Sequence, residues 1–144
     1  MKNWLLAVIA SVVAVIGIYL LINRFNVHKE IKIFHTNRPG GYQLRTRRNL
    51  HDGLSFGLDN RLRLTEIKVV PLAEWQTNRY ALPLWHLVSD SNSAPVIDFG
   101  YGQRIRGMKS AVAGAQPQPL EANTIYRLFV AAGNIKGQHD FEVR

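Results

Sequence analysis

The longest apolar run of the chain lies near its N-terminus. The run comprises nineteen residues, Trp4 to Ile22, and contains no charged side chain. A helix of this length is about 28 Å long, which matches the hydrocarbon thickness of a bilayer. Trp4 and Tyr19 stand near its ends, where amphipathic rings favour the headgroup level. The run predicts a single transmembrane helix over residues 4–22, and we assign residues 1–25 to a membrane anchor.

A cleaved signal peptide is the alternative to an anchor, since Lys2 supplies a short positive region before the run. Two observations favour a retained anchor. The run is longer than the roughly 7–15 apolar residues of a signal peptide. No small-x-small cleavage site follows it, because the exit reads Leu20-Leu21-Ile22-Asn23-Arg24-Phe25.

The flanking charges leave the orientation of the anchor open. Arg24, Lys29 and Lys32 follow the span and only Lys2 and the α-amine precede it, which favours a cytoplasmic C-terminal part. A three-residue tail before a first span is instead typical of a signal anchor, whose C-terminal part is exported. Because long domains translocate largely regardless of charge, we expect an extracytoplasmic domain, periplasmic or extracellular.

Small residues recur within the span at intervals of three, four and three. They are Ala7, Ala10, Ala14 and Gly17. This spacing places them on one helix face, where a second helix can approach closely. The pattern predicts self-association or association with a partner helix, although alanine and glycine are also common in membrane helices without such a role.

Beyond the anchor the pattern changes to the alternation of apolar and polar residues that is typical of β-strands. Apolar side chains alternate on both sides of Asp59-Asn60, at Leu54, Phe56, Leu58, Leu62 and Leu64. A loop over residues 59–61 keeps both apolar sets on one face, so the pattern predicts a hairpin there. The alternation then slips by one residue at Thr65-Glu66, which predicts a β-bulge.

Turn residues separate the remaining apolar runs. These runs predict strands over residues 82–88, 96–101, 104–108, 125–132 and 141–143 and one helical turn within 73–80. Trp85 is expected at the centre of the core. The Asn37–Gly41 turn cluster suggests the division of the chain, with a juxtamembrane stalk over residues 26–41 and one all-β domain over residues 42–144. Residues 31–34 fit either a short strand or a part of the stalk.

The segment from Leu120 to Gly133 resembles the corner before the penultimate strand of fibronectin type III and related immunoglobulin-like domains. A leucine lies six residues before a tyrosine, with a threonine between them, at Leu120, Thr124 and Tyr126. Ala122 replaces the proline usual in that family, and the cysteine pair of true immunoglobulin domains is absent. The resemblance implies an immunoglobulin-like β-sandwich in which the Tyr126 hydroxyl bonds to backbone upstream, and it implies no function.

Positive charge exceeds negative charge by eight over the whole chain. Such an excess suits anionic partners, and it also serves ordinary solubility. One basic set could bind anionic lipid headgroups or form a solvated sheet face: Arg45, Arg47, Arg48, Arg61 and Arg63. A second set lies in a glycine-flanked loop and is a candidate recognition loop: Tyr101, Arg104 and Arg106.

No catalytic pattern is present in the sequence. The chain has no cysteine, which excludes disulfides and thiolate chemistry. No phosphate-binding glycine loop and no G-x-S-x-G motif occur. None of the histidines forms a pair at close metal-ligand spacing: His28, His35, His51, His86 and His139. We therefore expect neither an enzyme nor a bound metal or cofactor.

Together these patterns predict an exported, single-pass membrane protein whose β-sandwich binds or scaffolds protein partners. The alternative is a basic module that holds an anionic partner at the membrane and faces the cytoplasm if the flanking charges decide the orientation. Of the anionic partners, lipid is favoured over nucleic acid.

Overall fold

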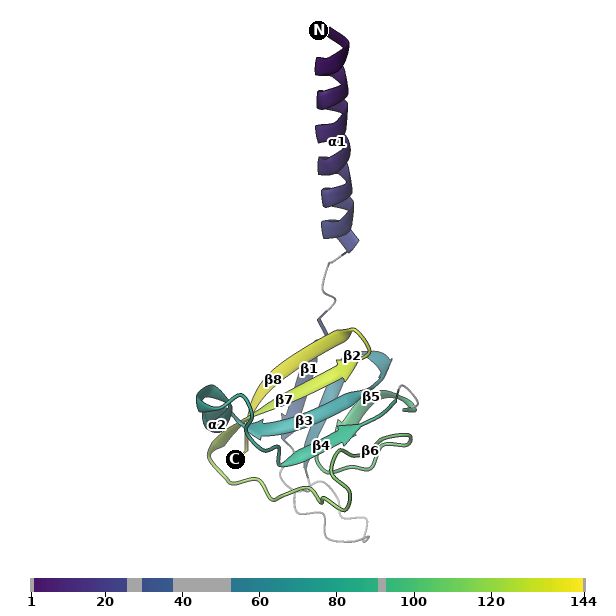
Figure 1. Cartoon of the computed structure of the whole chain (residues 1–144). Helices are drawn as coiled ribbons and strands as arrows, with labels where there is room; N and C mark the ends of the chain where they lie inside the picture. Colours follow the sequence, from purple (N-terminus) through teal and green to yellow (C-terminus); the bar gives the residue numbers. More distant parts are fainter. Residues whose placement is uncertain (1, 26–29, 38–52, 91–92, 144) are drawn as a thin grey trace.

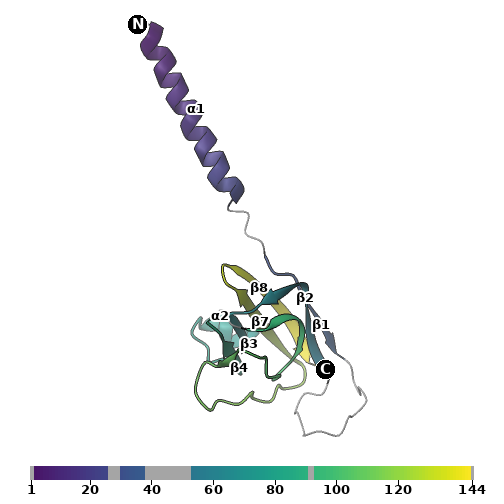
Figure 2. The ribbon, with the colours of Figure 1, turned by 90° about the vertical axis from the view of Figure 1, so that its right-hand side faces the viewer.

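The computed structural model describes residues 2–25, 30–37, 53–90 and 93–143. It contains an N-terminal helix, α1 (Lys2–Phe25), and a β-rich domain (Figure 1). The segment Leu6–Asn23 of α1 is long and apolar enough to cross a membrane, and none of it is buried against the rest of the chain. The helix projects from the domain in both views (Figures 1 and 2). Since α1 is apolar on every face, a bilayer is the environment that suits it.

The described part of the domain contains two antiparallel sheets, in the strand orders β1-β2-β5 and β6-β4-β3-β7-β8. The strands are β1 (Ile33–Asn37), β2 (Leu54–Arg63), β3 (Glu66–Pro71), β4 (Trp85–Val88), β5 (Pro95–Gly100), β6 (Lys109–Ser110), β7 (Thr124–Ala132) and β8 (Ile135–Val143). A short helix, α2 (Leu72–Thr77), follows β3. Its Trp75 ring lies 4.8 Å from the ring of Phe129, on the face of the five-stranded sheet that is turned away from the core.

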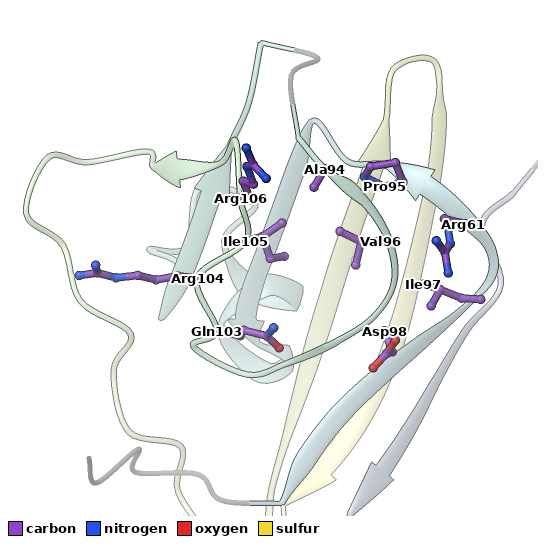
Figure 3. Close-up of a pocket in the computed structure, with 10 residues that line it drawn as sticks. All are labelled: Arg61, Ala94, Pro95, Val96, Ile97, Asp98, Gln103, Arg104, Ile105 and Arg106. Atoms are coloured by element: carbon purple, nitrogen blue, oxygen red, sulfur yellow. The ribbon is translucent and has the colours of Figure 1, made fainter. Parts of the chain in front are cut away.

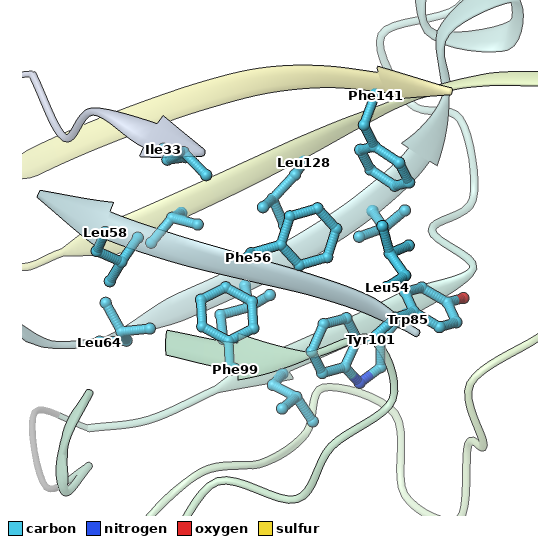
Figure 4. Close-up of a cluster of buried hydrophobic side chains, with 14 of the residues drawn as sticks. Ile33, Leu54, Phe56, Leu58, Leu64, Trp85, Phe99, Tyr101, Leu128 and Phe141 are labelled. Carbon is cyan, nitrogen blue, oxygen red and sulfur yellow. The ribbon is translucent and has the colours of Figure 1, made fainter. Parts of the chain in front are cut away.

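The core lies between the two sheets and is built from the alternating positions of their strands (Figure 4). Phe56 of β2 is fully buried, and its ring centroid lies 5.6 Å from that of Phe99 and 5.0 Å from that of Phe141. Leu128 of β7 is fully buried as well. These contacts join strands of both sheets, so the alternation read from the sequence corresponds to one shared apolar interior.

The hairpin predicted at residues 59–61 is wrong. β2 continues through Asp59 and Asn60 to Arg63, and its register against β5 shifts between Gly57 and Leu62. The backbone N–H of Asp59 donates to the carbonyl of Lys32 at 3.1 Å, which keeps this stretch in the sheet. The irregularity of the strand therefore takes the form of a bulge rather than a turn.

The slip at Thr65-Glu66 marks the place where the chain passes from one sheet to the other. The N–H of Thr65 donates to the carbonyl of Ala131 at 2.8 Å, and its own carbonyl accepts from Ser89 at 2.8 Å. Two neighbours in the five-stranded sheet thus hold Thr65 just before β3 begins. The prediction of a bulge at this position is wrong, because the chain crosses here from the sheet of β2 to the sheet of β3.

One further expectation is wrong, and one alternative is decided. Residues 104–108 form no strand, and the short strand β6 follows them instead. Of the two alternatives for residues 31–34, the structure has the strand, since residues 33–37 form β1 of the three-stranded sheet. Ile31 and Ile33 are buried in the core, so apolar burial extends the folded domain toward the anchor.

The strand β1 also meets β8, and we call this contact the β1–β8 seam. The N–H of Ile31 donates to the carbonyl of Lys136 at 3.1 Å, and Glu30 forms a parallel bridge with Lys136. Gly137 faces Ile31 so closely that a side chain at this position would overlap the Ile31 backbone. The seam brings the edges of the two sheets together on one side of the core.

The residues expected to be critical for the fold are buried. Trp85, Leu120 and Tyr126 are 3%, 9% and 2% exposed. The hydroxyl oxygen of Tyr126 accepts a hydrogen bond from the backbone N–H of Glu121 at 2.7 Å. The predicted bond between this tyrosine and upstream backbone is confirmed, and it ties the segment before β7 to the core.

Candidate anion-binding site

A cavity of about 320 Å³ lies between β5 and the loop that follows it (Figure 3). Three arginines border it: Arg61 from β2, and Arg104 and Arg106 from the loop. Asp98 is the acidic residue of the border. Arg104 extends outward from the loop, whereas Arg61 lies on the other side of the cavity (Figure 3). We call Arg61, Arg104 and Arg106, with this cavity, the basic pocket.

The loop that carries Arg104 and Arg106 is held at several points. Gly102 and Gly107 adopt left-handed backbone conformations, with φ of 74° and 84°, which favour glycine. Ile105 is buried between the two arginines and anchors the loop to the core. The N–H of Ala94 donates to the carbonyl of Arg106 at 2.8 Å, so the loop is fixed beside the start of β5.

A further bond closes the start of the loop. The side-chain oxygen of Gln103 accepts from the N–H of Gly100 at 2.7 Å. With the two glycines and Ile105, this bond fixes the backbone before ligand arrives. The arginine positions are therefore set by the fold, and only their side chains have to be ordered by a ligand.

Tyr101, the remaining member of the predicted recognition loop, lies in the core. It is 7% exposed, and its ring packs edge-on against Trp85 at a centroid distance of 5.3 Å. Its hydroxyl donates to the carbonyl of Gln118 at 2.8 Å. Burial raises the pKa of Tyr101 far above its usual value, and the neighbouring Tyr126 adds to this effect. We assign Tyr101 a structural role beneath the loop.

The first predicted basic set is divided by the structure. Arg61 borders the basic pocket, and Arg63, also on β2, donates to the carbonyl of Ser93 at 3.2 Å. Arg45, Arg47 and Arg48 lie outside the described residues. The sequence did not indicate that Arg61 lies near Arg104 and Arg106. The pairing of β2 with β5 brings them together.

The arginines of the basic pocket have no ion-pair partner among the described residues, whereas Arg127 has one. Arg127 binds both carboxylate oxygens of Asp140, at 2.6 and 2.8 Å, and this contact lowers the pKa of Asp140. Within the described residues no carboxylate forms an ion pair with Arg61, Arg104 or Arg106. Their charge is available to a ligand.

Two histidines meet at the β1–β8 seam. Nδ1 of His35 lies 2.7 Å from Nε2 of His139, within hydrogen-bonding distance. The sequence did not indicate this pair, because 104 positions separate the two residues. Burial lowers the pKa of His139, and the neighbouring His35 lowers it further, while Asp140 acts in the opposite direction. His86 bonds Glu66 instead, at 2.8 Å, and His28 and His51 lie outside the described residues.

The predicted association face of the anchor lies on α1. Its residues are exposed in the single chain: Ala7, Ala10, Ala14 and Gly17. A methyl group added at Gly17 would meet no atom within 4 Å. The face therefore has room for another helix, and its use stays a prediction.

Neither a protein-family model, nor a curated protein, nor a solved structure matches the chain. The assignment of function therefore rests on the geometry described above.

Proposed function

We propose that the protein is a non-catalytic binding module, held at a membrane by α1, whose basic pocket binds an acidic segment of a partner protein. The grouping of Arg61, Arg104 and Arg106 around one cavity, without ion-pair partners among the described residues, carries this proposal. Guanidinium groups bind carboxylates through paired hydrogen bonds, so aspartate and glutamate side chains suit the pocket.

The position of the pocket supports an extended ligand. It borders β5, which is an outer strand of the three-stranded sheet. Edge strands present backbone groups that an added peptide can use, while side chains next to the edge select the sequence. An acidic segment that passes beside β5 would meet the arginines on both sides of the cavity.

The expected interaction is weak and sensitive to salt. Each exposed arginine–carboxylate pair contributes about 0.2–1 kcal/mol, so three pairs give only modest affinity. Screening at physiological ionic strength acts over about 8 Å and reduces it further. A partner in the same membrane would offset this weakness by its high local concentration.

For the fold of the module we infer an immunoglobulin-like sandwich of fibronectin type III character. In such domains the first, second and fifth strands lie in one sheet, opposite a sheet that contains the third and the last two. The sheets β1-β2-β5 and β6-β4-β3-β7-β8 have this order. Tyr126 near the start of β7, bonded to the backbone of Glu121, also supports the inference.

We also infer that the domain is exported, because long domains translocate largely regardless of the charges that flank the span. An alkaline phosphatase fused to the C-terminus should be active in cells, and a cytoplasmic reporter at the same position should be inactive. The reverse pattern would place the module on the cytoplasmic side.

The binding proposal is tested with the full-length chain in neutral detergent micelles and a fluorescent glutamate-rich peptide. Changing Arg61, Arg104 and Arg106 to alanine should weaken binding by about threefold to about a hundredfold, since three pairs together lose about 0.6–3 kcal/mol and about 1.4 kcal/mol corresponds to tenfold. A control removes the same charge from exposed lysines elsewhere: Lys32, Lys109 and Lys136. This control should bind the peptide as the parent does.

Three outcomes would contradict the proposal. Equal weakening in both variants would show that net charge alone attracts the peptide. Unchanged binding in the arginine variant would exclude the basic pocket. Capture of vesicles containing an anionic lipid, lost in the arginine variant without any peptide binding by the parent, would identify a lipid headgroup as the ligand.

A further inference from the structure

The β1–β8 seam contains two nitrogen donors that face each other across strands distant in sequence. Nδ1 of His35 and Nε2 of His139 are 2.7 Å apart, with ring centroids 5.0 Å apart and ring planes at 49°. Both residues lie in paired strands, His35 opposite Phe56 and His139 opposite Leu128. The backbone therefore holds the two imidazoles in proximity.

We propose that His35 and His139 together bind one transition-metal ion of the Zn²⁺ class across the β1–β8 seam. Histidine is the commonest protein ligand of such ions, through the lone pair of a neutral ring nitrogen. Imidazole suits zinc, copper and nickel, whereas magnesium and calcium prefer oxygen ligands. The nitrogen pair thus selects the class of metal.

The geometry requires a short separation of the two nitrogens and a rotation of both rings. Zinc–nitrogen bonds are about 2.0–2.1 Å long, so two nitrogens on a tetrahedral ion lie about 3.3 Å apart and about 2.9 Å apart at a right angle. From the 2.7 Å separation in the structure, the two nitrogens have to part by about 0.2–0.6 Å, and each ring has to turn by about 35–45° so that both lone pairs point at the ion. His35 is exposed and His139 half-buried, so rotation of the side chains provides this movement without a change of backbone.

Water completes the coordination in this proposal. A cavity of about 550 Å³ borders His35 together with Asp140 and Glu142, and it gives water access to the His35 side of the pair. Both carboxylate oxygens of the adjacent Asp140 are engaged by Arg127, at 2.6 and 2.8 Å. Within the described residues no group of three or more histidine or acidic side chains is suited to a metal. The site therefore offers two protein ligands and has moderate affinity.

Metal binding would join the first described strand of the domain to its last one. The two histidines are 104 positions apart, so an unfolded chain does not hold them together. An ion that binds only the folded form shifts the unfolding equilibrium toward that form. The ion would add a second link along the same seam, three to four residues from the backbone hydrogen bond between Ile31 and Lys136.

The proposal is tested with the full-length chain in neutral micelles at pH 7.5, stripped of metal with a chelator. Zinc chloride should raise the midpoint of thermal unfolding, and magnesium chloride should leave it unchanged. His35→Ala and His139→Ala should each weaken zinc binding at least about tenfold, because one of two protein ligands is lost. The control His86→Ala should bind zinc like the parent, since His86 is engaged with Glu66.

A spectroscopic measurement covers the case in which these alanine variants do not fold. A chain that lacks the other histidines, His28, His51 and His86, should still show two-nitrogen hyperfine coupling to one Cu²⁺ in paramagnetic resonance. A copper spectrum without two nitrogens in this chain overturns the proposal. An unchanged thermal midpoint at millimolar zinc, or full zinc affinity in a folded His35→Ala variant, overturns it as well.

Discussion

Gly137→Ala should destabilise the domain, because the β1–β8 seam leaves no space for a side chain there. A Cβ at this position would overlap the carbonyl oxygen of Ile31 and lie 2.8 Å from its Cβ and 3.1 Å from its carbonyl carbon. Two of these atoms belong to the backbone, so a change of rotamer does not relieve the overlap. Gly137 has an ordinary backbone conformation, and the effect is therefore one of space.

The expected loss of unfolding free energy has two parts, the cost of overpacking and the loss of a backbone hydrogen bond. Forcing extra atoms into a packed site costs about 1–3 kcal/mol. If β1 moves away, the hydrogen bond from Ile31 to Lys136 is lost as well, which costs about 1 kcal/mol. We expect a loss of about 2–4 kcal/mol, a large part of the 5–15 kcal/mol typical of a domain.

The assay is urea unfolding of the full-length chain in neutral micelles, followed by the near-ultraviolet circular dichroism of the buried aromatic rings. Gly57→Ala is the matched control, because Gly57 also lies in a strand and an added Cβ would meet no atom within 4 Å. Its stability should stay the same or rise slightly, since alanine restricts the unfolded chain. A loss below about 0.5 kcal/mol for Gly137→Ala, or equal losses in both variants, would refute the reasoning.

Three further predictions concern the core and the anchor. Trp85→Ala should cost about 3–5 kcal/mol in the same urea assay, and a loss below about 1 kcal/mol would show that this ring is not central. Burial raises the pKa of Tyr101, so its stabilising contribution is complete below the ordinary tyrosine pKa of about 10 and is lost as the pH rises further. Absorbance at alkaline pH should show tyrosine ionisation that occurs only as the domain unfolds, and the amplitude of this step should be smaller in Tyr101→Phe. Leucine at both Ala10 and Ala14 should weaken association in a membrane two-hybrid assay without reducing insertion, whereas leucine at both Val8 and Val12, on the opposite face, should do neither.

Local pattern was sufficient for the features of the fold that depend on neighbours in sequence. The uncharged run predicted α1, and the alternation after Thr124 predicted β7. The corner spacing predicted the buried Tyr126 and its backbone bond. In each case the signal lies within a few turns of helix or within one strand, where periodicity reports directly on the buried face.

The features that were predicted wrongly or not at all depend on pairing between segments that are distant in sequence. Alternation around Asp59-Asn60 fits a turn and a continuous strand equally well, and the bond from Asp59 to Lys32 decides for the strand. The same limit applies to the sites. Arg61 joins the arginines of the 100–108 loop only because β2 pairs with β5, and His35 meets His139 only because the sheet edges converge.

The burial of Ile31 and Ile33 shortens the tether between membrane and domain. Only residues 26–29 lie between the end of α1 and Glu30, which already bridges to Lys136. Five chain steps at no more than about 3.6 Å each keep Glu30 within about 20 Å of the helix end. The edge of the domain that carries Glu30 therefore stays next to the bilayer surface, and partners anchored in the same membrane can reach it.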